Sequence, residues 1–393
     1  MLNESYIVGA VRTPIGSLGG ALATVPAPEL GATCIRALLE RSRLAPGELD
    51  EVILGNVVSS GLGQNPARQA AIRGGVPVSV GAMTVNKVCG SGLRAVVLAD
   101  QAIRLGEAHA VVAGGIESMS LAPYLLPYAR RGYRLGNAEL VDAMIHDGLW
   151  DVYHGKSMGC FGDQCAAKFG FSRDEQDDYA VRSYTRAQRA IADGVFRDEI
   201  VPVEVPGRKG PTLVTEDEEP ARFQEDKLRS LRPAFSDHGT VTAGNGSSVN
   251  DGAAALLVLS KARCEERGLT PLARIVGSAT FSREPEWFTI APIDAIRELM
   301  AKTGWSIDRT DQFEINEAFS CVALAAQREL GIPDEKLNPF GGAVALGHPI
   351  GASGARLIVT LLTGLARTGG TRGVACLCVG GGEAVALAVE RIP

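Results

Sequence analysis

The chain has 393 residues, of which 46% are hydrophobic and 21% charged, and its formal net charge is −6. This composition is typical of a globular protein and excludes a disordered, collagen-like or coiled-coil chain. Mild acidity without runs of Lys and Arg disfavours nucleic acid as a partner, because neutralising phosphates requires clustered bases. No apolar run approaches the ~20 residues of a membrane-spanning helix, so we expect no membrane contact.

The length corresponds to two or three compact units at about 150 residues per domain. The N-terminal sequence lacks the charged and apolar regions of a signal peptide, so we expect a cytoplasmic protein. The eight cysteines are scattered through the chain, and we therefore expect reduced thiols and not a disulfide framework.

Short apolar runs recur along the chain, each followed by a glycine turn and a helical pattern. Strands are predicted at residues 51–54, 110–113, 253–259, 274–276 and 374–379. Helices are predicted at residues 29–43, 93–105 and 293–302, and from the capping box at Ser172 to about Asp193, with Gly194 just beyond. This alternation predicts an α/β fold with mostly parallel strands.

The two ends of the chain look like copies of each other. Residues 51–56 lead to a turn at Cys89, and residues 311–316 lead, at nearly the same spacing, to a turn at His348. A strand pattern that ends in glycine and glutamate then follows in both copies. Three landmarks in one order predict two homologous halves, although generic turns between strands and helices are an alternative explanation.

The stretch between the halves differs in character, with prolines, a capped helix and a polar section at residues 204–232. It is expected to run over the surface, where substrate-binding subdomains usually lie. We therefore predict an N-terminal half at residues 1–118 plus 250–268, a loop subdomain at 119–249, and a C-terminal half at 269–393.

Cys89 is the first candidate for chemistry, because it directly precedes a helical pattern in the sequence N-K-V-C-G-S-G. A thiol at a helix N-terminus is expected to have a lowered pKa, which favours the reactive thiolate. A small buried cysteine in a tight turn is the alternative.

His348 occupies in the second half the place that Cys89 occupies in the first. A lone histidine is more often structural, but this placement predicts a pair in which His348 draws the proton from Cys89. Cys378 ends a strand before three glycines, and we prefer it to Cys376 on the same strand face, although periodicity alone does not separate the two. Asn316 follows a strand, where it could cap a helix or orient a water molecule.

Taken together, these motifs resemble the thiolases, the coenzyme-A-dependent acyltransferases that make or cleave 3-ketoacyl-CoA. The similarity runs end to end and is carried by residues 86–94, 114–120, 231–244, 316–319, 341–356 and 378–383. It implies a thiolase fold, in which two duplicated βαβαβαββ halves pack as α-β-α-β-α layers with an inserted loop subdomain.

The resemblance also implies a role for each candidate. Cys89 would be the acylated nucleophile, and His348 would activate it and act on the leaving thiol of CoA. Cys378 would exchange a proton on the α-carbon of the acyl-CoA. Asn316 would hold a water molecule that stabilises one oxyanion together with His348, and the N–H groups of Cys89 and Gly380 would form the second oxyanion hole.

For CoA, the resemblance implies that Ser247 meets the pantetheine arm and that Phe235 lines its tunnel. Arg222 and Lys227 could meet the phosphates, although the local charge is balanced. Further substrate contacts are expected from Ser157, Met158, Phe288, Ala318 and Phe319. We expect no metal and no cofactor other than CoA as substrate and product, and a homodimer or homotetramer, with the first part of the inserted subdomain making the larger assembly.

Two segments depart from the short-chain biosynthetic thiolases. Ser157-Met158-Gly159 stands where those proteins carry His-Met-Gly, and Trp287-Phe288 stands where they carry a small residue and methionine. The expected function is condensation of two acetyl-CoA to acetoacetyl-CoA, or the reverse thiolysis. A longer-chain or branched 3-ketoacyl-CoA thiolase, a decarboxylating ketoacyl synthase and a non-catalytic acyl-CoA-binding module are the alternatives.

Overall fold

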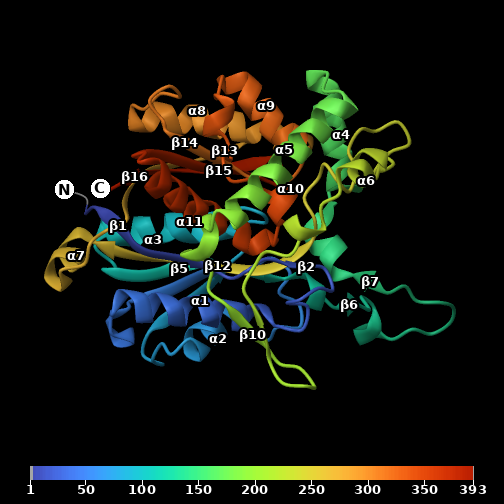
Figure 1. Cartoon of the computed structure of the whole chain (residues 1–393). Helices are drawn as coiled ribbons and strands as arrows, with labels where there is room; N and C mark the ends of the chain where they lie inside the picture. The colour runs from blue at the N-terminus through green and yellow to red at the C-terminus, as the bar shows by residue number, and fades with distance from the viewer. Residues whose placement is uncertain (1–2, 393) are drawn as a thin grey trace.

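The computed structural model describes residues 3–392, whose elements stack as α-β-α-β-α layers (Figure 1). The N-terminal half contributes strands β1 (Ser5–Arg12), β3 (Glu51–Gly55), β4 (Gly81–Val85), β5 (Ala110–Ser118) and β12 (Asn250–Ser260). The C-terminal half contributes β13 (Ala273–Ser282), β14 (Gln312–Ile315), β15 (Arg372–Val379) and β16 (Glu383–Arg391). Each strand that the sequence predicts is confirmed, with bounds extended by a few residues.

The strand order shows the duplication directly. The main sheet runs β14-β15-β16-β13-β1-β12-β5-β3-β4, so that β14-β15-β16-β13 repeats β3-β5-β12-β1. In both copies the first pair is parallel and the following pairs are antiparallel. The counterpart of β4 in the second half is reduced to an isolated bridge between Phe313 and Leu337. The predicted βαβαβαββ plan is therefore confirmed, with one strand shortened. The expectation of mostly parallel strands is wrong, because β12, β1, β13 and β16 at the centre of the sheet pair antiparallel with their neighbours.

A shared bulge marks the junction of the halves. β1 pairs with β13 through Tyr6 with Arg274 and Ile7 with Ala273. The register shifts after Ile7 in β1 and after Ile275 in β13, and the sequence Ile-Val-Gly stands at both places. This repeat is a further sign of duplication, but it becomes visible only when the two strands lie side by side.

Two helices form the central layer between the two halves of the main sheet, α3 (Ser91–Leu105) and α11 (Ile350–Thr368). They pack so closely that a Cβ atom on Gly92 would lie 2.9 Å from the Gly351 oxygen, and one on Gly354 would lie 2.4 Å from the Leu93 nitrogen. Glycine is needed here because backbones in this contact leave no room for a side chain. The N-terminal ends of both helices, and the turns before them, are thereby brought together.

The outer layers are helical as well. α1 (Ala27–Ser42) and α2 (Pro66–Arg73) cover one face, and α8 (Ala291–Thr303) and α9 (Ser320–Leu330) cover the other. The remaining short elements are β2 (Gly16–Ser17), α7 (Lys261–Arg267) and α10 (Ala343–Leu346). Within residues 3–392, no helix combines the length and the apolar character needed to cross a membrane.

The segment between β5 and β12 holds small hairpins and helices on one side of the molecule (Figure 1). These are β6 (Tyr124–Leu125), β7 (Val141–Asp142), β8 (Trp150–Asp151), β9 (Lys156–Ser157), α4 (Met158–Phe169), α5 (Arg173–Ala192), β10 (Val203–Val205), β11 (Thr212–Val214) and α6 (Glu225–Ser230). The capping box at Ser172 is confirmed, with Ser172 Oγ accepting from Glu175 N and Gly194 in the left-handed conformation. The boundaries of the inserted subdomain stay a prediction.

Arg12 ties this segment to the N-terminal half. Its buried guanidinium contacts Glu199 at 2.6 Å and Asp217 at 2.6 Å, and both carboxylates are buried too. Removing one member of such a buried group leaves an uncompensated charge, which is costly. The polar section that holds Asp217 therefore does not lie wholly at the surface.

Candidate active site

Cys89 lies on a strained turn between β4 and α3. The residue before it, Val88, has φ 48°, a left-handed conformation that a β-branched residue seldom adopts. Local hydrogen bonds hold this turn, because Ser91 Oγ accepts from Lys87 N at 2.8 Å and donates to the Val88 oxygen at 2.6 Å. Strain of this kind is retained where a structure presents a functional side chain, and Cys89 is half-buried there.

Cys378 and Gly380 lie beside Cys89. The Gly380 N–H donates toward the Cys89 sulfur, and the Cys89 charge is near enough to raise the pKa of Cys378. Burial is the main cause of the high pKa of Cys378, which is enclosed at the end of β15. Cys376, two residues earlier, instead points its sulfur toward the Pro292 oxygen of the outer layer, 3.9 Å away. The structure thus separates the two strand cysteines as the glycine turn suggested.

His348 and Asn316 form a second group. Asn316 Nδ2 lies 3.5 Å from His348 Nε2, and Ser353 Oγ lies 2.5 Å from His348 Nδ1. Ser353 Oγ also lies 3.0 Å from the Pro349 oxygen, which can only accept, so the hydroxyl donates there and accepts from Nδ1–H. This assignment makes Nε2 of the neutral ring a hydrogen-bond acceptor whose lone pair faces Asn316 Nδ2, so Nε2 is the nitrogen that can take up a proton.

Burial decides the charge state of both groups. It raises the pKa of Cys89 to about 11, although the N–H groups of Gly380 and Cys89 act in the opposite direction. It also lowers the pKa of His348 to about 3, with the Arg356 charge as the second cause. The expectation of a lowered Cys89 pKa is therefore wrong, because desolvation outweighs the helix N-terminus. The protein rests with a neutral thiol and a neutral imidazole.

Alkylation of Cys89 tests this charge state. We expect the iodoacetamide rate at Cys89, followed by peptide mapping, to rise about tenfold per pH unit between about pH 6 and 9, because the thiolate is the reactive form. No inflection is expected near the ordinary pKa of histidine, since His348 stays neutral in this range. A plateau by pH 7 would contradict the argument and show that the helix N-terminus dominates.

The structure excludes one alternative for Asn316. α9 begins at Ser320 with Phe319 as its N-cap residue, so Asn316 does not cap that helix. Instead the Asn316 N–H donates to the Cys376 oxygen at 2.9 Å, which extends the pairing of β14 with β15. Its Oδ1 is buried and has no hydrogen-bond partner among residues 3–392. This arrangement directs the amide toward the interior beside His348.

Glu117 is a site residue that the sequence pattern did not single out. Its buried carboxylate accepts from Asn56 Nδ2 at 2.8 Å, from Gly351 N at 2.8 Å and from the N–H groups of Val57 and Val58. Burial raises the pKa of Glu117 to about 7. The carboxylate joins the turn after β3 to the first turn of α11 and thus connects the two halves. The sequence signal that could have identified it is its position near the end of β5, in the strand pattern that the two halves share.

Ser353 is a second such residue, and its role can be tested. We expect Ser353→Ala to lower kcat about tenfold with little change in KM, because the ring loses the hydrogen bond that orients it. Thr368→Ala is the matched control, since Thr368 Oγ1 makes the same kind of intrahelical bond, to the Gly364 oxygen. Steady-state kinetics with equal amounts of folded protein would check this. A rise in KM at constant kcat would contradict an orienting role.

The residues expected to meet CoA form one neighbourhood. Ser247 donates through N and Oγ to the Ala318 oxygen at 3.0 and 3.1 Å. The Phe319 ring packs edge-on against Phe235, with centroids 6.2 Å apart.

Met158 lies near Gly380, its sulfur 3.5 Å from where a Cβ on that glycine would be. Ser157 precedes Met158 as the N-cap residue of α4, and Phe288 is buried against Phe161.

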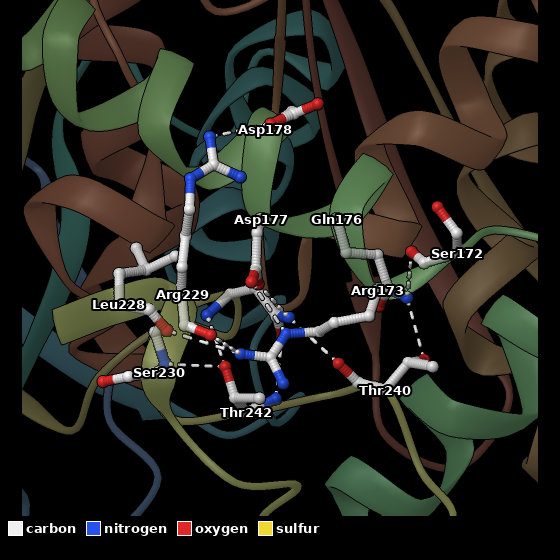
Figure 2. A network of polar contacts seen from close by, with 12 residues as sticks. Ser172, Arg173, Gln176, Asp177, Asp178, Leu228, Arg229, Ser230, Thr240 and Thr242 are labelled. Carbon is white, nitrogen blue, oxygen red and sulfur yellow. Dashed lines mark hydrogen bonds and ion pairs between the residues drawn. The ribbon is translucent and has the colours of Figure 1, made fainter. Parts of the chain in front are cut away.

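A polar network fixes the loop that carries Ser247, and Figure 2 shows the part of it around Arg173, Asp177 and Thr242. Asn245 donates to Asp177 Oδ1 at 2.9 Å and accepts from Thr242 N at 2.8 Å. Asp177 in turn accepts from Arg173 Nε at 2.8 Å on the first turns of α5. These contacts hold the loop between α5 and the N-terminus of α9, where Ser320 N donates to the Asn245 oxygen.

The two cations expected at the CoA phosphates are both exposed. Arg222 is exposed and paired with Glu218. Lys227 is exposed on α6. Their contact with CoA stays a prediction.

Comparison with known proteins agrees with this architecture. Residues 5–262 match the family described as "Thiolase, N-terminal domain" and residues 269–391 match "Thiolase, C-terminal domain". Acetyl-CoA acetyltransferases of Chromobacterium violaceum and Pseudomonas aeruginosa are 54% and 52% identical to this chain, each over 99% of this chain and 100% of the relative. The crystal structure of the Bacillus anthracis acetyl-CoA acetyltransferase has a TM-score of 0.97 at 42% identity, covering 100% of this chain and 99% of that chain. The chain therefore belongs to the thiolase family.

Proposed function

We propose that this protein is a thiolase that condenses two acetyl-CoA to acetoacetyl-CoA and CoA, and that catalyses the reverse thiolysis, through an acyl group on Cys89. The observation that carries the proposal is that Cys89, just before the N-terminus of α3, lies beside Cys378 and the Gly380 N–H. In the second half, Asn316 Nδ2 lies 3.5 Å from His348 Nε2. The full-length relatives named acetyl-CoA acetyltransferase support acetyl-CoA as the substrate.

The first half-reaction uses Cys89 and His348. The Cys89 sulfur attacks the thioester carbonyl while its proton passes to His348 Nε2, and CoA leaves as a thiol with that proton. A neutral thiol and a neutral base suit this step, because the thiolate is needed only as the bond forms. The N–H groups of Cys89 and Gly380 stabilise the oxyanion that develops.

The second half-reaction uses Cys378. Its thiol passes its proton to His348 Nε2, and the thiolate so formed takes a proton from the methyl group of the second acetyl-CoA. The resulting carbanion attacks the acetyl group on Cys89, whose sulfur leaves and takes the proton back from His348. A high pKa makes Cys378 a strong base once deprotonated, which matches a weakly acidic C–H group. Asn316, a water molecule and His348 stabilise the enolate oxygen. Two half-reactions through one acyl-enzyme give ping-pong kinetics.

The intact mass of the protein after incubation with acetoacetyl-CoA, without free CoA, tests the proposal. We expect a single acetyl adduct on the Cys89 peptide, which added CoA removes. An adduct only from longer or branched 3-ketoacyl-CoA would instead favour the longer-chain alternative. CoA binding without any adduct would favour a binding module. A decarboxylating synthase has no need of a C–H base, so Cys378 counts against it.

The partners follow from this chemistry. We propose that CoA and its thioesters are the only small-molecule partners, that no metal takes part, and that the protein forms a homodimer or homotetramer in the cytoplasm. β4 lies at the edge of the main sheet, and no strand other than β3 pairs with it among residues 3–392. The loop between β6 and β7 exposes Tyr128 and Leu135. An open sheet edge and exposed apolar side chains are both suited to subunit contacts. Activity unchanged by dialysis against EDTA, and a mass by light scattering of two or four chains, would support this proposal.

A further inference from the structure

His154 lies between two carboxylates from different segments. Its Nδ1 is 2.9 Å from Asp151 Oδ2, and its Nε2 is 3.6 Å from Glu286 Oε2. The Asp151 carboxylate is buried and also accepts from the His154 backbone N–H at 2.7 Å, so the ring is held firmly on the β8–β9 hairpin. Glu286 comes from the short helix Pro285–Ile290, on the far side of the ring. The imidazole therefore bridges two segments far apart in the sequence.

Both segments border the reactive cysteines. The hairpin leads through Ser157 into Met158, which lies beside Gly380, and Tyr153 at its tip lies near Gly381. The segment Pro285–Ile290 carries Phe288, whose buried side chain belongs to the same apolar cluster as Cys378.

A chain of aromatic contacts connects the bridge to the interior. The His154 ring packs edge-on against Phe161, with centroids 5.6 Å apart, and Phe161 packs edge-on against Phe288 at 6.1 Å. The position of His154 therefore bears on how far Phe161 and Phe288 can move. Since interiors are close-packed, small displacements of such rings change the space available to a neighbouring group.

We propose that His154 is a specificity-determining positioning residue, which joins the β8–β9 hairpin to the segment Pro285–Ile290 through Asp151 and Glu286 and so limits the length of the acyl group. This inference rests on the proposed function, because it concerns the acyl group that Cys89 carries. His154 does not touch the reacting atoms in this scheme. It acts through Phe161 and Phe288, which it holds toward the site.

The test compares two substrates in the thiolysis direction, acetoacetyl-CoA and 3-ketohexanoyl-CoA, each with free CoA. The variants are His154→Asn, whose amide can still reach Asp151 but not Glu286, and Glu286→Gln. The measured quantity is the ratio of kcat/KM for the longer substrate to kcat/KM for the shorter one. A fall in the amount of folded protein cancels in this ratio, so a merely structural effect does not change it.

We expect the ratio to rise about threefold in both variants, the scale of one solvent-exposed polar contact between side chains. It should rise no further in the double variant, because both changes break one bridge. Glu284→Gln is the matched control, since Glu284 is an exposed acid two residues away that pairs only loosely with Arg283 at 3.8 Å. An unchanged ratio in active variants would overturn this inference and leave the proposed function standing. No turnover of either substrate by the unaltered protein would overturn both.

Discussion

Cys89→Ala is expected to lower turnover of acetoacetyl-CoA with CoA by at least about 10⁴-fold, because both half-reactions pass through the sulfur. The acetyl adduct should vanish from the intact-mass spectrum at the same time. The substitution removes one half-buried sulfur and leaves Val88 and the hydrogen bonds of Ser91 in place. The melting temperature should therefore change little, and it is the measurement that separates lost chemistry from lost structure.

Cys264→Ala is the matched control for this variant. Cys264 is a free, buried cysteine on α7, which lies at the edge of the molecule opposite α4 and the β6–β7 hairpin (Figure 1). We expect full turnover and an unchanged adduct. Turnover retained by Cys89→Ala would refute Cys89 as the nucleophile, and an adduct that persists on another peptide would identify its replacement.

The parts of the site that could be predicted from the sequence are those on repeated local patterns. Cys89 and His348 stand before corresponding helices in the two halves, α3 and α11, and the duplication predicted this correspondence of the two turns. The capping box at Ser172 is equally local, and the structure has it as predicted. Each of these features depends on residues within a few positions of one another.

The features that the sequence did not show depend on contacts between distant segments. The pKa of Cys89 is set by burial, which no local pattern reports. Asn316 has a cap-like sequence, but its N–H is taken by the Cys376 oxygen of a neighbouring strand, and the helix starts later. Glu117 gains its role only because Gly351 of the other half donates to it. Tertiary contacts thus decide both charge and orientation in this site.

Duplication also explains how the proposed site can hold two bases of different strength. α3 and α11 cross at Gly92 and Gly354, so the turns before them face each other. His348 lies on the turn before α11 and has a lowered pKa, whereas Cys378 ends a strand of the second half and has a raised pKa, and burial causes both shifts. Burial disfavours the charged form of each group, which acts in opposite directions on an acid and a base.

This difference gives the second large prediction. Cys378→Ser is expected to lower condensation of acetyl-CoA about 10³-fold, because a hydroxyl is a far poorer base partner for the α-carbon than a thiolate. Exchange of the acetyl group between acetyl-CoA and labelled CoA should remain within about tenfold of the unaltered protein, since it needs only Cys89 and His348. Loss of deuterium uptake from D₂O into the acetyl methyl group would show that proton removal from the α-carbon is the step that has failed.

Cys376→Ser is the matched control, with the same substitution two residues earlier on the same buried strand. Its sulfur points toward Pro292 in the outer layer, so we expect condensation, acetyl exchange and deuterium uptake all to persist. If Cys378→Ser lowered acetyl exchange and condensation by one factor, Cys378 would act before the acyl-enzyme forms, and the assignment of the two bases would be wrong. If deuterium uptake persisted, the base for the α-carbon would be another residue. Only the loss of condensation and deuterium uptake with acetyl exchange retained is consistent with separate bases for the two half-reactions.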